Sequence, residues 1–363
     1  MAEAPDLGAI IRLVDEACLS GRAQDGAAAM RALHRLVPDD VGVRVALART
    51  LFRAEQWEEA WDAYDVRFRL LPGAFPTVTR PGPDGPEPVP IWRGGPQPGA
   101  LLVMGEQGLG DSIQFARYLP LLRQPGRRVH VSLDVRIRRL LAPLCEGLDL
   151  LPPGGGRIAG VRHWVPLLDL PRALGIGSGR ITGTVPYLRA EPDRVARMRA
   201  RIGDGGLRIG IVWQGNPKSP ADPNRSAPLA AFAPLAEIPG VRLFSLQKGP
   251  GEEQESPFPL DRLGPEMDNG PDWFLDTAAA QTALDLVVSI CTGTVHLAGA
   301  LGRPGFVILH GRHADWRWLA GRTDSPYYPS FRLVHCPDGG ADWRAAVEKV
   351  TKLIRSGDTP RAA

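Results

Sequence analysis

The chain has 363 residues, 44% of them hydrophobic, which is too long for one ordinary core, so we expect two or three domains. A formal net charge of +3 is small for this length and provides no electrostatic basis for nucleic-acid binding. Asp6 and Arg12 interrupt any apolar core of a signal peptide, and no uncharged run approaches the roughly 20 apolar residues of a membrane span. We therefore expect a soluble, cytoplasmic protein of bacterial type. The four cysteines share no CxxC spacing, which argues against a disulfide framework or a zinc site.

Residues 1–72 are predicted to be helical and to form two tetratricopeptide-like repeats. Pro38 and Pro72 are 34 residues apart, the period of that repeat. If the second repeat starts at Val41, four residues match its preferences for Leu, a small residue, Ala and an aromatic, namely Leu47, Ala48, Ala60 and Tyr64. The first repeat, from Leu7, matches less well, and a plain helical hairpin with chance spacing is the alternative. Two repeats are few for an independent solenoid, so we expect this segment to pack on the rest of the chain.

Residues 73–99 are rich in Pro and Gly and are predicted to form a linker or an extended strap. This composition disfavours both a helix and a central strand. Trp92 is the residue that we expect to anchor the segment to a domain.

A strand, a glycine-containing loop and a helix open the first α/β domain, expected over residues 100–190. The apolar run Leu101–Met104 predicts a strand buried on both faces, and the loop 105–110 contains three glycines. Asp111 or Ser112 can cap the following helix, whose first N–H groups would be available to an anion. Further segments are predicted at 129–133 (strand), 135–145 (helix), 148–151 and 164–168.

A break near residues 190–206 precedes a second α/β region, expected to belong to a domain over residues 191–356 with a tail at 357–363. Strands and helices alternate here, which predicts a parallel sheet with crossover helices. The predicted strands are 209–213, 241–246, 286–290 and 306–309, and the predicted helices are 193–202, 229–238, 273–284, 295–301 and 342–355. We expect the last helix to return toward the first domain.

A second candidate site follows the strand that ends at Ile290. There Thr292-Gly293-Thr294 turns into a helix whose first turn contains His296. Threonine hydroxyls, backbone N–H groups and an imidazole at a helix start together suit a diphosphate. A histidine satisfied by its own neighbours is the alternative.

With the segment EQGLGDSIQFARYLP, this region resembles glycosyltransferase family 9, the ADP-heptose:lipopolysaccharide heptosyltransferase-like group. It is more closely similar to bacterial proteins that join tetratricopeptide repeats to such a domain. The resemblance extends over nearly the whole chain and includes WQGNP with Arg225-Ser226 after it, SLQKG, Asp276-Thr277-Ala278, and DWRWL followed by SPYYPS. It implies an α/β fold with an N-terminal all-α segment and GT-B architecture, in which two Rossmann-like parallel-sheet domains face a cleft. It also implies inversion at the sugar carbon and no required metal.

The resemblance assigns expected roles by position. Asp111 matches the family's Gly-Asp, where the carboxylate acts as base toward the acceptor hydroxyl. Arg225 matches a basic residue that contacts the donor diphosphate, where a guanidinium can bind with two N–H groups. Thr292, Gly293 and His296 match contacts to the donor phosphate and sugar.

The nucleoside is expected near Lys248 and a neighbouring acid, Glu252 or Glu253. A solvated lysine at a strand end is the alternative for Lys248. The full set of expected donor-binding residues is Gly108, Gly110, Arg225, Gln247, Lys248, Glu252, Thr292, Gly293, Thr294 and His296.

One departure from the family pattern concerns Cys291, where the family usually has Asp. A thiol cannot replace a carboxylate as acceptor, which puts the donor and the activity itself in question. The leading hypothesis is an inverting, metal-independent glycosyltransferase that uses a nucleotide sugar such as ADP-heptose, with a protein, peptide or glycan as acceptor. A protein acceptor would bind through the helical repeats. The alternative is a non-catalytic binding or scaffold protein with the same fold. A dehydrogenase is disfavoured, because residues 105–110 lack the GxGxxG spacing.

Overall fold

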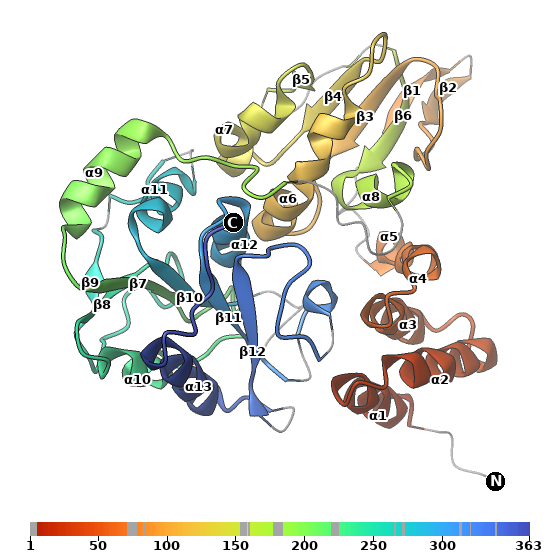
Figure 1. Ribbon diagram of the computed structural model, residues 1–363. Coiled ribbons are helices and arrows are strands. Elements are labelled where there is room, and N and C mark those ends of the chain that lie inside the picture. Colours follow the sequence, from red (N-terminus) through yellow and green to blue (C-terminus); the bar gives the residue numbers. More distant parts are fainter. Residues whose placement is uncertain are drawn as a thin grey trace.

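The computed structural model describes residues 6–70, 78–82, 84–152, 158, 160–176, 184–218, 225–264, 266–270, 273–311, 314–319, 321–337 and 340–363. Within these residues, a set of N-terminal helices is followed by two separate parallel β-sheets with helices packed on them (Figure 1). None of the helices in these ranges is both long and apolar enough to cross a membrane.

The N-terminal segment is helical, as predicted. Its elements are α1 (Leu7–Leu19), α2 (Ala23–Leu36), α3 (Val41–Arg53), α4 (Trp57–Tyr64) and α5 (Arg67–Leu70). The side chains of Asp6 and Asp40 accept hydrogen bonds from the first turns of α1 and α3, which fixes where these helices begin. Assignment of the helices to tetratricopeptide repeats stays a prediction.

The Pro- and Gly-rich strap contains an antiparallel hairpin, β1 (Thr79–Gly82) with β2 (Gly85–Pro88). Trp92 anchors the strap, as predicted. Its side chain is 2% exposed, its indole N–H donates to Gly95 O, and its backbone N–H donates to Trp164 O.

The first sheet has the order β5-β4-β3-β6, and all of its strands are parallel. They are β3 (Ala100–Met104), β4 (Val129–Ser132), β5 (Asp149–Leu150) and β6 (Val161–Pro166). The helix after β3, α6 (Leu109–Phe115), changes into a 3-10 helix, η1 (Ala116–Leu122), which contains Pro120. Proline has no N–H to donate to the carbonyl four residues earlier, so an α-helix does not continue through Pro120. The other helical turns are η2 (Val135–Ile137), α7 (Arg138–Leu141), η3 (Ala142–Cys145), η4 (Leu167–Asp169) and α8 (Leu170–Ala173).

The second sheet has the order β12-β11-β10-β7-β8-β9 and is also parallel throughout. Its strands are β7 (Leu207–Val212), β8 (Val241–Ser245), β9 (Asp261–Arg262), β10 (Leu286–Ile290), β11 (Gly305–Leu309) and β12 (Phe331–His335). The edge strands β9 and β12 were not predicted from the sequence. The accompanying helices are α9 (Pro192–Ile202), η5 (Leu229–Phe232), α10 (Ala233–Ala236), α11 (Leu275–Ala283), α12 (Gly293–Ala300), η6 (Trp316–Trp318) and α13 (Trp343–Arg355).

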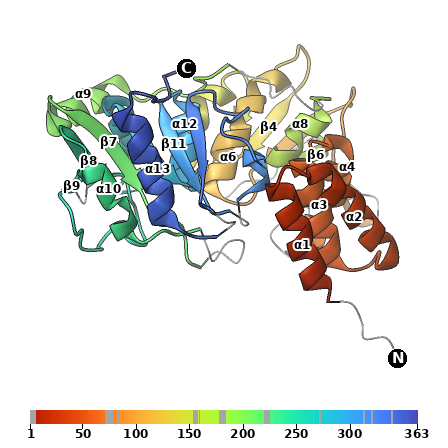
Figure 2. The ribbon, with the colours of Figure 1, turned by 60° about the horizontal axis from the view of Figure 1, so that its bottom comes forward.

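The prediction that the last helix returns toward the first domain is wrong. The apolar face of α13 joins the core formed by β7, β10 and β11, and the Arg355 guanidinium donates to Glu237 O beside α10. Figures 1 and 2 both place α13 next to α10. The residues after α13 turn back instead, and the backbone N–H of Ala363 donates to Gly302 O at the end of α12. Both sheets lie inside the ranges expected for the two α/β domains, whose limits stay predictions.

Candidate active site

Helix α6 begins at the carboxyl end of β3 and presents Asp111 in its first turn. Gly108, rather than Asp111 or Ser112, is the residue before the helix, which corrects the predicted cap. The Asp111 carboxylate reaches back instead, and its Oδ2 accepts a hydrogen bond of 2.9 Å from the Gly108 N–H. The other oxygen, Oδ1, forms an ion pair of 2.8 Å with Arg317 Nη2.

Helix α12 begins at the carboxyl end of β10, directly against the start of α6. A Cβ at Gly110 would lie 3.0 Å from Gly293 Cα and 2.9 Å from His296 Cδ2, so glycine is required for this approach. Thr292 precedes the helix without capping it, and its buried hydroxyl has no hydrogen-bond partner among the described residues. The Thr294 carbonyl accepts a hydrogen bond from Gln281 Nε2. The two helix starts that the sequence singled out are therefore in contact.

His296 lies in the first turn of α12 and is buried, with 6% of its surface exposed. Its Nδ1 is 3.1 Å from the Tyr328 hydroxyl, and its ring stacks on Trp318 with centroids 5.4 Å apart. Burial, reinforced by the charge of Arg317, lowers the pKa of His296 to about 3. The imidazole is therefore neutral at physiological pH.

Cys291 stands where the family that the motifs resemble usually has Asp. Like His296, it is buried. The Trp318 indole N–H points at Cys291 Sγ at 3.1 Å, and Arg225 Nη1 lies 3.5 Å from the Cys291 carbonyl oxygen. Burial raises the pKa of the Cys291 thiol, which keeps it protonated. A buried neutral thiol is a poor nucleophile, so the site offers no thiolate chemistry.

The segment DWRWL, residues 315–319, also belongs to the site, although the sequence assigned its residues no role. In the structure, Arg317 forms ion pairs of 2.8 Å with both Asp315 and Asp111, and its side chain is 4% exposed. Burial acts to raise the pKa of Asp315, but the neighbouring charge of Arg317 and its backbone N–H hold the net pKa below the ordinary value. The signal in the sequence was the unusual concentration of tryptophan, arginine and aspartate in four residues.

A cavity of about 650 Å³ opens where β8 and β9 end, and the predicted nucleoside residues Lys248, Glu252 and Glu253 line it with Gln247. Lys248 Nζ lies 3.2 Å from Glu252 Oε1, and Glu252 Oε2 accepts from the Gly249 N–H. The Gln247 amide accepts from the Trp213 and Gln214 N–H groups and donates to two carbonyls. Gln247 therefore shapes the cavity through bonds within the protein, and its contact with a donor stays a prediction.

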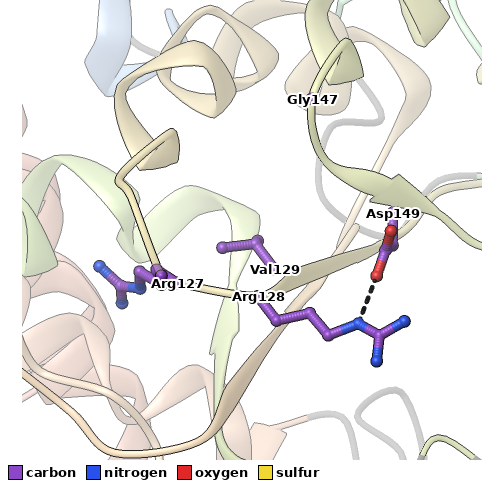
Figure 3. Close-up of a pocket in the computed structure, with 6 residues that line it drawn as sticks. Arg127, Arg128, Val129, Gly147 and Asp149 are labelled. Carbon is purple, nitrogen blue, oxygen red and sulfur yellow. Dashed lines mark hydrogen bonds and ion pairs between the residues drawn. The ribbon is translucent and has the colours of Figure 1, made fainter.

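A second, smaller hollow of about 270 Å³ lies at the amino ends of β4 and β5 (Figure 3). Its polar side consists of Arg127, Arg128 and Asp149, and Arg128 pairs with Asp149 at 2.9 Å. Ligands of open α/β sheets bind outside the carboxyl ends of the strands, where Asp111 lies. We therefore do not assign the hollow to the candidate site.

The fold is of the GT-B type, with a helical segment before two parallel-sheet Rossmann-like units. The glycosyl transferase family 9 protein of Veillonella parvula superposes with a TM-score of 0.50 at 12% sequence identity, over 71% of this chain and 96% of that chain. This likeness shows the fold that the two proteins share. The Escherichia coli ADP-heptose LPS heptosyltransferase II gives a TM-score of 0.48 at 15% identity, over 71% of this chain and 99% of that chain.

In sequence, no protein-family profile matches the chain. Protein FlbA of Caulobacter vibrioides is 29% identical to it over 346 residues, which is 88% of this chain and 56% of that protein. The chain thus spans little more than half the length of this curated relative.

Proposed function

We propose that the protein is an inverting glycosyltransferase that moves a heptose or hexose from a nucleotide-sugar donor, such as ADP-heptose, to a protein, peptide or glycan. The observation that supports this most is the contact between two helix starts, one with Asp111 and the other with Thr292 and Gly293. The cavity beside Lys248 and Glu252 lies at the carboxyl edge of the same second sheet and is large enough for a nucleoside. We expect no metal requirement, as in the family that the motifs resemble, and a cytoplasmic location.

In the proposed reaction, an oxygen of the acceptor hydroxyl forms a bond to the anomeric carbon as the bond from that carbon to the diphosphate oxygen breaks. The nucleoside diphosphate leaves with the electron pair, and Asp111 takes the proton of the hydroxyl. A carboxylate oxygen can accept more than one hydrogen bond, so Oδ2 of Asp111 can receive the hydroxyl beside the Gly108 N–H. The diphosphate is proposed to lie at the start of α12, near Arg225 and the Thr292 hydroxyl, which has no hydrogen-bond partner in the described part of the chain.

Two observations favour the alternative of a non-catalytic binding or scaffold protein. Both carboxylate oxygens of Asp111 already have partners within the chain, and Cys291 stands where the family has an acid. Such a protein would bind the nucleotide without turnover.

The first experiment is a thermal-shift panel of nucleoside diphosphates and nucleotide sugars on the full chain. A ligand present at about 100 times its Kd adds roughly 2.7 kcal/mol to stability, so a true donor is readily detected. The best ligand is then offered with protein, peptide and glycan acceptors. Nucleotide binding without transfer to any acceptor would favour the scaffold alternative, and the absence of any nucleotide binding would contradict both.

Asp111→Asn separates the two hypotheses further. Asn can still accept a hydrogen bond from the Gly108 N–H but carries no charge to pair with Arg317, so a thermal melt first checks that the variant folds. It cannot take a proton, so we expect turnover to fall by roughly 10²–10⁴ with donor affinity nearly intact. Transfer at the wild-type rate would remove Asp111 from the mechanism.

A further inference from the structure

The segment Asp315–Trp318 connects all three parts of the structure through consecutive side chains. Trp316 faces the N-terminal helices, Arg317 faces Asp111 of the first α/β unit, and Trp318 packs on His296 of the second. The contacts of Trp316 and Arg317 determine what this arrangement can do.

The N-terminal helices enclose Trp316 in aromatic rings. Phe52 of α3 stacks on it with centroids 3.9 Å apart and an interplanar angle of 15°. Three side chains of α4 meet its ring edge to face at 5.9 to 6.4 Å, namely Trp57, Trp61 and Tyr64. The Arg53 guanidinium donates to Ala314 O, so α3 also holds the backbone that leads into the segment. The indole of Trp316 is 5% exposed and has little freedom to move.

The same helices also hold the loop that leads into α6. Gln107 has a φ of 58°, a left-handed backbone conformation that is uncommon for residues other than glycine. Its side-chain amide donates a hydrogen bond of 2.8 Å to the Tyr64 hydroxyl. The preceding residue, Glu106, forms a buried ion pair with Arg67 of α5. The N-terminal helices therefore contact the chain on both sides of the Asp111–Arg317 ion pair.

We propose that Arg317 is a positioning residue for the Asp111 carboxylate, and that Trp316, seated between α3 and α4, holds Arg317 in place. This inference rests on the proposed function, in which Asp111 is the base. It gives the N-terminal helices a part in catalysis besides any part in partner binding. The guanidinium spans two carboxylates, Asp315 through Nη1 and Asp111 through Nη2, and a lysine ammonium lacks this planar fork.

The test compares Trp316→Ala with Trp316→Phe in the full chain, because loss of the buried Arg317 charge can prevent folding. Trp316→Ala removes the ring that stacks on Phe52, and a misplaced base is expected to lower kcat by up to about 100-fold. The KM for the donor should change less than about twofold, because Trp316 is buried among the N-terminal helices and is not one of the residues proposed to bind the donor. Phe preserves the stack and should restore most of kcat.

The matched control is Met30→Ala, a fully buried residue of α2 that belongs to the helical core and not to the rings around Trp316. It should lower the melting temperature as Trp316→Ala does but leave kcat near the wild-type value. Equal losses of kcat in the two variants would show that only the stability of the helices matters and would overturn the proposal. So would an unchanged kcat in Trp316→Ala.

A second readout needs no transfer and so distinguishes the failure of this inference from that of the proposed function. Amide hydrogen exchange over residues 108–112 should quicken in Trp316→Ala and in Arg317→Lys, but not in Met30→Ala. If the wild type transfers no sugar, the proposed function fails. If the exchange rates of these amides are the same in all variants, the positioning role fails whether or not transfer is observed.

Discussion

His296 and Cys291 lie in one buried corner beside Trp318, and burial keeps both side chains uncharged. An uncharged side chain can bind an anion only through hydrogen bonds. A neutral imidazole can donate or accept one hydrogen bond per ring nitrogen, and a protonated thiol is only a weak donor. Side-chain positive charge for an anion at the start of α12 must therefore come from Arg225, because Arg317 already pairs with Asp315 and Asp111.

The pKa of His296 predicts a dependence of stability on pH. In the unfolded chain the imidazole takes up a proton near pH 6.5, whereas in the folded protein its pKa is about 3. As the pH falls from 6.5 toward 3, the unfolded state binds more protons and the free energy of unfolding decreases. Between pH 7 and pH 5, we expect the wild type to lose about 2 kcal/mol more than His296→Gln in urea unfolding. Equal losses in the two proteins would contradict the assigned burial.

Arg225 supplies a second prediction at this scale. Its guanidinium lies beside the Cys291 carbonyl, at the turn that leads into α12. If it binds the diphosphate, Arg225→Ala should weaken nucleotide binding by about 1.5–3 kcal/mol, the range for a charge-assisted hydrogen bond. Titration calorimetry measures the nucleotide affinity. The matched control is Arg128→Ala, because Arg128 lies at the amino ends of the strands of the first sheet, away from the candidate site. Unchanged affinity in a folded Arg225→Ala variant would refute the placement.

In the candidate site, α6 contacts α12 directly, and a Cβ on Gly110 would lie 3.0 Å from Gly293 Cα. Glycine at position 110 therefore lets the two helix starts, whose first N–H groups lack partners inside their own helices, converge on one place. At Gly293 an added Cβ would instead meet the Phe274 ring at 3.2 Å. The sequence showed each glycine as part of a turn, and the reason for Gly110 appears when the two helices are brought together.

Gly110→Ala tests this contact. The added methyl group would lie at 2.9–3.0 Å from His296 and Gly293, so the helices must separate. We expect a loss of stability of about 1–3 kcal/mol, as for overpacked cores, together with loss of nucleotide binding. Gly105→Ala is the control, because its nearest neighbour would be 3.5 Å away, which is ordinary contact. A Gly110→Ala protein as stable as this control would argue against the tight approach.

At the scale of the whole molecule, a buried ion network attaches the N-terminal helices to the first sheet. Arg67 of α5 pairs with Glu106 at 3.0 Å and Asp169 at 2.6 Å, and all three side chains are at most 5% exposed. Burial raises the pKa of both acids, and the charge of Arg67 opposes this shift. The network and the aromatic rings around Trp316 hold the helices against both α/β units, which agrees with the expectation that the helical segment packs on the rest of the chain.

Arg67→Ala should therefore be strongly destabilising. It leaves two buried carboxylates without their shared cation, which typically costs about 3–5 kcal/mol. Arg344→Ala, which breaks an exposed pair with Glu348 on α13, should change stability by no more than about 0.5 kcal/mol. Urea unfolding at pH 7 measures both variants. A small effect of Arg67→Ala would mean that the other contacts of the helices, such as those of Arg53 and Tyr64, are sufficient to attach them.

Local sequence patterns indicated most of the elements and which residues to propose for the candidate site. Apolar runs marked β3, β7, β10 and β11, because parallel strands buried on both faces require such runs. The residues that follow β3 and β10 could be proposed as a site, because the carboxyl ends of parallel strands are where α/β folds bind ligands. Trp92 could be identified as an anchor, because it is the one tryptophan of a segment rich in Pro and Gly.

Only the tertiary structure decided which elements and side chains pack against each other. The periodicity of α13 showed that one side is buried but not against which sheet, and the two-residue strand β9 is too short to give a pattern. The ion pair of Asp111 with Arg317 joins residues far apart in the chain, and nothing near either one indicates the other. Hydrophobic periodicity and turn preference are properties of a few consecutive residues, whereas such pairings depend on the shapes and charges of whole surfaces that meet only when the chain folds.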